Sequence, residues 1–153
     1  MKKLQLLKKS LNGCKKNFPL NSNVKQENQT GQIMEPVNKF LYKHKGCYFV
    51  EGVSPESIDS LESFEIRDDD IFIITYPKSG TIWTQNIVSL ILHEGRHGTE
   101  NITLIDRAPW LECNISHIDF PNRPSPRLFT SHLPYYLVPK GLQNKRAKIL
   151  LHW

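Results

Sequence analysis

The sequence has 153 residues, of which 39% are hydrophobic and 23% are charged, so it can form one modest domain with an apolar core and is not a wholly disordered chain. The formal net charge of +5 arises in residues 1–33, which hold seven lysines and one glutamate, and the remaining residues are close to neutral. A basic face for nucleic acid is therefore not predicted. The sequence contains no run of about 18 apolar residues, so a membrane-spanning helix is not predicted either.

Residues 1–33 are rich in Asn, Gln and Lys, which predicts a basic, disordered extension. Leucines among the lysines of residues 1–11 would also allow a short amphipathic helix on an anionic membrane, although a disordered tail is the simpler interpretation. The composition changes at Met34, so we expect the folded part to occupy residues 34–153.

Residues 40–64 contain signals for short elements. The mixture of aromatic residues and glycines in residues 40–53 predicts extended segments around a turn at Gly46. Ser54 followed by Pro55 is typical of a helix start, with the serine as cap and the proline at the first helical position. The helix is expected to end near Phe64.

The most informative segment is a strand, a tight loop and a helix. Residues 70–76 form a nearly continuous apolar run rich in β-branched residues, which is typical of a strand buried on both faces of a parallel sheet. The loop of residues 77–81 follows. Apolar residues then recur at helical spacing up to Gly95, which predicts a helix; they are Trp83, Ile87, Leu90 and Ile91.

The last third of the chain adds further elements of an α/β fold. Residues 95–106 are expected to form a polar connection, and residues 108–120 to include a short helix with Trp110 and Leu111. The proline-rich residues 121–126 interrupt regular structure. Residues 127–131 predict a second strand, with His132 at its carboxyl end, and residues 147–151 predict a third.

Two features could support chemistry. Lys78, Ser79, Gly80 and Thr81 lie between a strand and a helix start, where free N–H groups, a cation and hydroxyls form a cradle for phosphate or sulfate. From these residues alone, an ordinary strand-to-helix turn is an equal alternative. His132 follows a strand on the side where open α/β sheets bind ligands, so it could act as a general base.

The three cysteines are Cys14, Cys47 and Cys113, and no Cys-x-x-Cys pair occurs. Neither a disulfide framework nor a zinc site is therefore predicted, and we identify no metal ligands. This cysteine usage favours a reducing compartment, so we expect a cytoplasmic protein.

Three segments together resemble the cytosolic sulfotransferase family. Residues 75–83 read Thr-Tyr-Pro-Lys-Ser-Gly-Thr-Ile-Trp and resemble the family's phosphosulfate loop, while residues 127–134 read Arg-Leu-Phe-Thr-Ser-His-Leu-Pro and resemble its histidine segment. Between them, residues 107–112 read Arg-Ala-Pro-Trp-Leu-Glu and resemble a third family segment. The resemblance covers residues 34–150, and the Ile-Asp-Arg-Ala-Pro-Trp stretch is most similar to the amine sulfotransferase subgroup.

The resemblance implies a three-layer fold around a parallel sheet and transfer of a sulfuryl group from 3′-phosphoadenosine 5′-phosphosulfate to a small amine or hydroxyl acceptor, without a metal. Lys78 would stabilise the leaving oxygen, and His132 would take the acceptor's proton. The implied donor-binding residues are Lys78, Ser79, Gly80, Thr81, Ile82 and Trp83. The implied acceptor-binding residues are Trp110, Phe129, Thr130, Ser131 and His132, of which Trp110 could equally be a core residue.

The sequence departs from the family pattern in two places. Ile82 replaces a threonine of the loop, so one hydroxyl donor is missing and weaker donor binding is expected. After residue 150 the chain does not continue into the family's 3′-phosphate site, later loop or dimer motif, so residues 34–153 are expected to be the N-terminal part of a truncated sulfotransferase domain. A catalytically inactive fragment is therefore the alternative to an active enzyme, whereas a P-loop kinase is disfavoured because Lys78 precedes the glycine.

Overall fold

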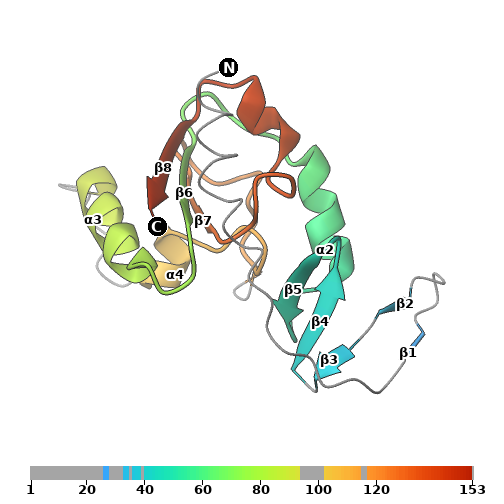
Figure 1. The fold of residues 1–153 in the computed structure, drawn as a ribbon. Coiled ribbons are helices and arrows are strands. Elements are labelled where there is room, and N and C mark those ends of the chain that lie inside the picture. Colours follow the sequence, from blue (N-terminus) through green and yellow to red (C-terminus); the bar gives the residue numbers. More distant parts are fainter. Residues whose placement is uncertain are drawn as a thin grey trace.

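The computed structural model describes residues 26–27, 33–34, 36–38, 40–93, 102–114 and 117–152 (Figure 1). Strands β1 (Gln26–Glu27) and β2 (Ile33–Met34) form a short antiparallel pair. The rest of the predicted extension 1–33 lies outside the described residues. No helix in the described ranges is long and apolar enough to cross a membrane.

A small antiparallel sheet precedes the main fold. Its strands are β3 (Pro36–Asn38), β4 (Leu41–His44) and β5 (Cys47–Val50), in that order. Lys45 and Gly46 connect β4 to β5 with φ angles of 45° and 80°. Positive φ angles at both positions are the backbone conformation that a tight two-residue hairpin loop requires. The predicted turn at Gly46 is confirmed.

The predicted helix at residues 54–64 is also confirmed. Helix α2 (Pro55–Ser60) continues into the 3₁₀ turn η2 (Leu61–Ser63). The Ser54 hydroxyl accepts the Ser57 N–H at 3.0 Å, so it satisfies one of the free donors of the first turn.

The central sheet has three parallel strands in the order β7 (Leu128–Ser131), β6 (Ile71–Thr75) and β8 (Lys148–His152). Every residue of β6 is buried, as its continuous apolar sequence predicts. Because β6 and β7 are parallel, their carboxyl ends lie at one edge, and the segments that follow them meet there.

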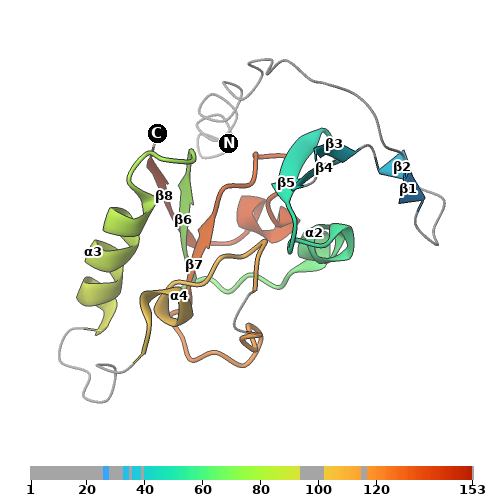
Figure 2. The same cartoon turned by 90° about the horizontal axis from the view of Figure 1, so that it is seen from below.

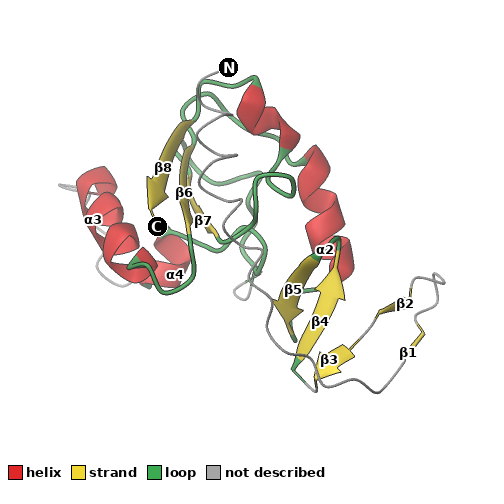
Figure 3. Ribbon diagram, in the orientation of Figure 1, coloured by secondary structure: helices red, strands yellow, loops and turns green. Residues whose placement is uncertain are grey.

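Helices and loops cover both faces of this sheet (Figures 1 and 2). On one face, Ile71 and Ile73 of β6 pack with Val88 of helix α3 (Thr81–His93). On the other, Phe72 and Ile74 belong to a larger apolar cluster that includes residues of α2 and η2. Successive side chains of β6 thus point to opposite faces of the sheet and contribute to two separate apolar clusters, which gives a three-layer arrangement. The predicted α/β fold class is confirmed (Figure 3).

One sequence-based prediction is wrong. Helix α4 comprises Leu104–Arg107, earlier than the short helix predicted within residues 108–120. Thr103 caps α4 by accepting the Asp106 N–H at 3.3 Å, and Pro109 follows its end. Trp110 instead forms a parallel β-bridge with Thr130, because the chain here extends along the free edge of β7.

Candidate functional site

The loop between β6 and α3 has an unusual backbone. Lys78 adopts a φ of 67° and Gly80 a φ of 96°, both in the left-handed region. Glycine adopts this conformation freely, whereas a lysine there costs about 1–2 kcal/mol. The Ser79 hydroxyl donates to the Tyr76 carbonyl at 2.7 Å and helps to close the turn. Such strain is typical of a functional loop.

The loop leads directly into the N-terminus of α3. The N–H groups of Thr81, Ile82 and Trp83 form the first turn, so they have no acceptors within the helix and carry the positive end of its dipole. Lys78 and Gly80 are exposed beside this turn, and the Trp83 side chain is 78% exposed. The predicted donor-binding residues therefore form one continuous segment that an anion can reach.

His132 lies beside the carboxyl end of β6. Its Nδ1 is 2.8 Å from the Thr75 carbonyl oxygen, which can only accept a hydrogen bond. The proton of the neutral ring must therefore be on Nδ1, and Nε2 keeps a lone pair. Burial lowers the pKa of His132 below its ordinary value of 6.5, against an opposing effect of the Thr75 carbonyl. His132 is thus neutral at pH 7 and suited to act as a base.

Thr75 connects His132 to the loop. Its hydroxyl oxygen lies 3.1 Å from His132 Nδ1 and 2.7 Å from the hydroxyl of Thr81, the first residue of α3. Loop, strand end and histidine therefore form one hydrogen-bonded unit through Thr75.

The predicted acceptor-binding residues fall into two groups. The Trp110 ring is partly buried, and its centroid is 4.5 Å from that of His132. Phe129, Thr130 and Ser131 are at most 1% exposed. Phe129 stacks on Phe72 in the core with ring centroids 5.4 Å apart, so the structure brings Trp110, and not these three residues, to an accessible position beside His132.

The contacts of the other two buried residues are internal. The Thr130 hydroxyl accepts a hydrogen bond from Gln85 Nε2 at 2.8 Å, which attaches α3 to β7. The Ser131 hydroxyl accepts the Leu133 N–H at 3.0 Å and fixes the turn after the strand. Both residues therefore support the segment that holds His132.

Two residues of this region were not assigned a role from the sequence, Thr75 and Glu112. The Glu112 carboxylate accepts the backbone N–H of His132 at 2.7 Å. Each of the two residues lies in one of the three segments that carry the family resemblance, Thr75 in residues 75–83 and Glu112 in residues 107–112, but the sequence alone does not show what either side chain contacts.

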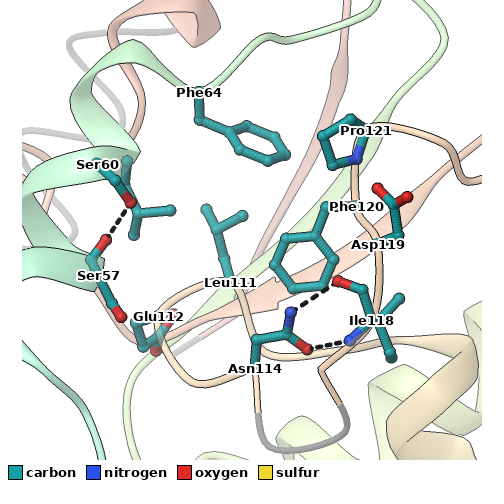
Figure 4. A pocket seen from close by; sticks show the side chains of 11 residues that line it. Ser57, Ser60, Phe64, Leu111, Glu112, Asn114, Ile118, Asp119, Phe120 and Pro121 are labelled. Atoms are coloured by element: carbon teal, nitrogen blue, oxygen red, sulfur yellow. Dashed lines mark hydrogen bonds between the residues drawn. The ribbon is translucent and has the colours of Figure 1, made fainter.

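A cavity of about 400 Å³ lies apart from the loop, between α2–η2 and residues 111–121 (Figure 4). Aromatic and aliphatic side chains such as Phe64, Leu111 and Phe120 line it, together with polar residues that include Ser57, Ser60 and Glu112. None of the predicted site residues lines this cavity. Within the part of the chain that the structure describes, no group of three or more His, Cys, Asp or Glu side chains could hold a metal ion.

A family model described as Sulfotransferase domain matches residues 68–152. Among curated proteins, the chain is 56% identical over 119 residues to the amine sulfotransferase of Oryctolagus cuniculus. That match covers 76% of this chain and 40% of the relative, so the chain spans less than half of that relative's length.

Solved structures give a consistent result. A putative steroid sulphotransferase of Arabidopsis thaliana superposes with a TM-score of 0.59 at 23% identity, covering 85% of this chain and 47% of the other, which shows similarity of fold. Mouse sulfotransferase SULT7A1, solved in complex with PAP, gives a TM-score of 0.54 at 31% identity, covering 72% of this chain and 38% of the other.

Proposed function

Because the chain belongs to the sulfotransferase family, we propose that the protein transfers a sulfuryl group from 3′-phosphoadenosine 5′-phosphosulfate to a small amine or hydroxyl acceptor. The observation that carries this proposal is the hydrogen-bonded unit of loop, Thr75 and His132 at one edge of the parallel sheet. An anion cradle and a neutral base at one edge are what sulfuryl transfer requires.

The loop is proposed to bind the 5′-phosphosulfate of the donor. The N–H groups of Thr81, Ile82 and Trp83 would donate to its oxygens, with Ser79 and Gly80 completing the curved backbone. Lys78 would stabilise the negative charge that develops on the phosphate oxygen as it leaves sulfur. The left-handed backbone at Lys78 and Gly80 supports this role, as does the PAP complex of the mouse relative.

His132 is proposed to be the general base. Its Nε2 would take a proton from the acceptor as the acceptor's nitrogen or oxygen bonds to sulfur and the bond from sulfur to the donor's phosphate oxygen breaks. The Nδ1–H bond to the Thr75 carbonyl holds the required tautomer. The imidazolium that forms keeps this hydrogen bond.

The acceptor is proposed to be a small amine, on the similarity to the rabbit amine sulfotransferase, and to lie against the exposed part of Trp110. Phe129, Thr130 and Ser131 would shape the site from the core, without direct contact. A cytoplasmic location and a small-molecule partner rather than nucleic acid are part of this proposal.

The test is a transfer assay with sulfur-labelled donor and a panel of primary amines and phenols. We expect sulfated product from the wild-type chain and a rate about 10²–10⁴-fold lower for His132→Asn, the usual contribution of a positioned base. Lys78→Met should lower the rate by a comparable factor. His117→Asn is the matched control, because His117 is exposed and its left-handed backbone tolerates asparagine.

A wild-type rate in His132→Asn and in Lys78→Met would contradict the proposal. A chain that binds the donor without forming product would instead support the catalytically inactive alternative. Donor binding should therefore be measured on the same samples.

A further inference from the structure

Glu112 is a buried carboxylate next to the proposed base. Its side chain is 9% exposed, and Oε1 accepts the His132 backbone N–H at 2.7 Å. Its second oxygen, Oε2, is buried without a hydrogen-bond partner. A buried carboxyl oxygen without a hydrogen-bond partner lowers the stability of the folded state, so the burial of the Glu112 carboxyl group requires an explanation.

The pairing along the free edge of β7 supplies this explanation. Thr130 exchanges two backbone hydrogen bonds, each 2.8 Å long, with residues 109 and 111. Continued parallel pairing would next join the His132 N–H to the Leu111 carbonyl. The chain instead turns, with the Cys113 N–H donating to the Trp110 carbonyl at 3.3 Å. The Glu112 side chain takes the place of the missing backbone acceptor.

His132 is therefore held from two sides. Glu112 fixes its backbone from the edge strand, and the Thr75 carbonyl fixes its ring from β6. The Trp110 ring packs against the imidazole at a centroid distance of 4.5 Å. Loss of the backbone anchor would leave the ring free to turn away from Thr75, and the tautomer preference would be lost with that bond.

We propose that Glu112 is the positioning residue of His132, and that its Oε1 holds the backbone so that Nδ1–H remains on the Thr75 carbonyl and Nε2 is presented to the acceptor. The catalytic part of this inference rests on the proposed function, whereas the structural part does not. Burial raises the pKa of Glu112, against opposing effects of the backbone N–H groups of His132 and Glu112 and of the Ser131 hydroxyl. A neutral carboxyl group can still accept the hydrogen bond from His132.

The test compares Glu112→Gln, whose amide oxygen can replace Oε1, with Glu112→Leu, which has similar bulk and no acceptor. Nitrogen-15 NMR reports the tautomer of His132 and the shift of its backbone amide. We expect wild type and Glu112→Gln to show the Nδ1–H tautomer and a hydrogen-bonded amide. Glu112→Leu should lose the amide shift and give mixed tautomers.

Asn114→Ala is the matched control. Asn114 makes two hydrogen bonds with the Ile118 backbone in the same loop, so its removal loosens the loop and leaves His132 untouched. An Nδ1–H tautomer and an amide shift in Glu112→Leu equal to those of wild type would overturn the proposal. Equal loss in Asn114→Ala would also overturn it, because a general loosening would then explain the effect.

A second measurement covers the case in which Glu112→Leu does not fold. In labelled wild-type protein, a scalar coupling across the hydrogen bond should join the His132 amide nitrogen to the Glu112 carboxyl carbon, and its absence would overturn the proposal. These spectra require neither donor nor turnover. A failed transfer assay with intact His132 signatures would therefore count against the proposed function alone.

Discussion

At the scale of single residues, the proposed role of His132 as a base depends on its protonation. Nδ1 faces a carbonyl oxygen, and burial disfavours the charged ring. Both effects keep the side chain neutral at pH 7 with its lone pair on Nε2. The same groups therefore determine its competence as a base and its contribution to stability.

This arrangement predicts a pH-dependent stability. The pKa of His132 is lowered in the folded state, so the unfolded state binds the proton more readily. Its contribution is therefore fully present above pH 6.5, the ordinary histidine value, and is lost as the pH falls below it. We expect the unfolding free energy of wild type to fall more between pH 7 and pH 5 than that of His132→Gln, measured by urea titration. An equal fall in both proteins would contradict this assignment.

The sequence predicts the loop residues and His132 as site residues because their types and positions are informative along the chain, and the structure brings them together at one edge of the sheet. The sequence did not identify Glu112 or Thr75, since their roles depend on which backbone groups lack partners after folding. It also assigned Phe129 to the acceptor site, whereas this ring packs in the core with Phe64, Phe72 and Phe120. From the sequence alone, an aromatic residue in a strand that packs in the core cannot be distinguished from one that contacts an acceptor.

At the scale of elements, a buried ion pair joins the starts of β6 and β7. Arg127 donates Nε–H to Asp70 Oδ1 at 2.8 Å and Nη2–H to Oδ2 at 2.6 Å. The two side chains are 2% and 0% exposed, and the guanidinium lies over the rings of Phe64 and Phe129. This pair joins the residues that precede β6 and β7, whose parallel register brings Ile74 opposite Ser131 at the end where His132 lies.

Breaking this pair should be costly. We expect Arg127→Leu to lower the unfolding free energy by about 3–5 kcal/mol, because the Asp70 carboxylate would remain buried without its partner. The measurement is urea titration followed by tryptophan fluorescence. Lys140→Ala is the control, since the Lys140–Glu62 pair is exposed and its loss should matter much less. A loss for Arg127→Leu no larger than that of the control would refute the interpretation.

Helix α3 shows the limit of what the periodicity of apolar residues can predict. The apolar spacing predicted the helix, and the structure confirms it. The residues that gave this spacing are nevertheless exposed; they are Trp83, Ile87, Leu90 and Ile91. The face on the sheet instead includes Gln85 and Ser89, with Val88. Gln85 donates to the Ala108 carbonyl at 3.1 Å and to Thr130, so hydrogen bonds attach this face. The spacing of apolar residues predicts that a segment is helical, whereas tertiary contacts determine which face of the helix is buried.

At the scale of the whole molecule, the strand–loop–helix unit and the neighbouring strand β7 form the site together. Three strands of a parallel sheet were predicted from short apolar runs in the sequence, whereas the strand order β7–β6–β8 was not predicted. The path of residues 108–120 could not be predicted, because Trp110 and Leu111 pair with the edge of β7 through backbone contacts distant in sequence. The segment that supplies Glu112 was therefore the least predictable part of the site.

The most direct test of the central claim is a thermal melt of the chain with and without 3′-phosphoadenosine 5′-phosphosulfate, in wild type and in Lys78→Met. We expect a cooperative transition whose midpoint temperature rises with donor concentration in wild type, because binding is linked to folding, and rises much less in the variant. A wild-type transition unmoved by the donor, or an equal rise in Lys78→Met, would contradict the claim that the loop before α3 binds the donor.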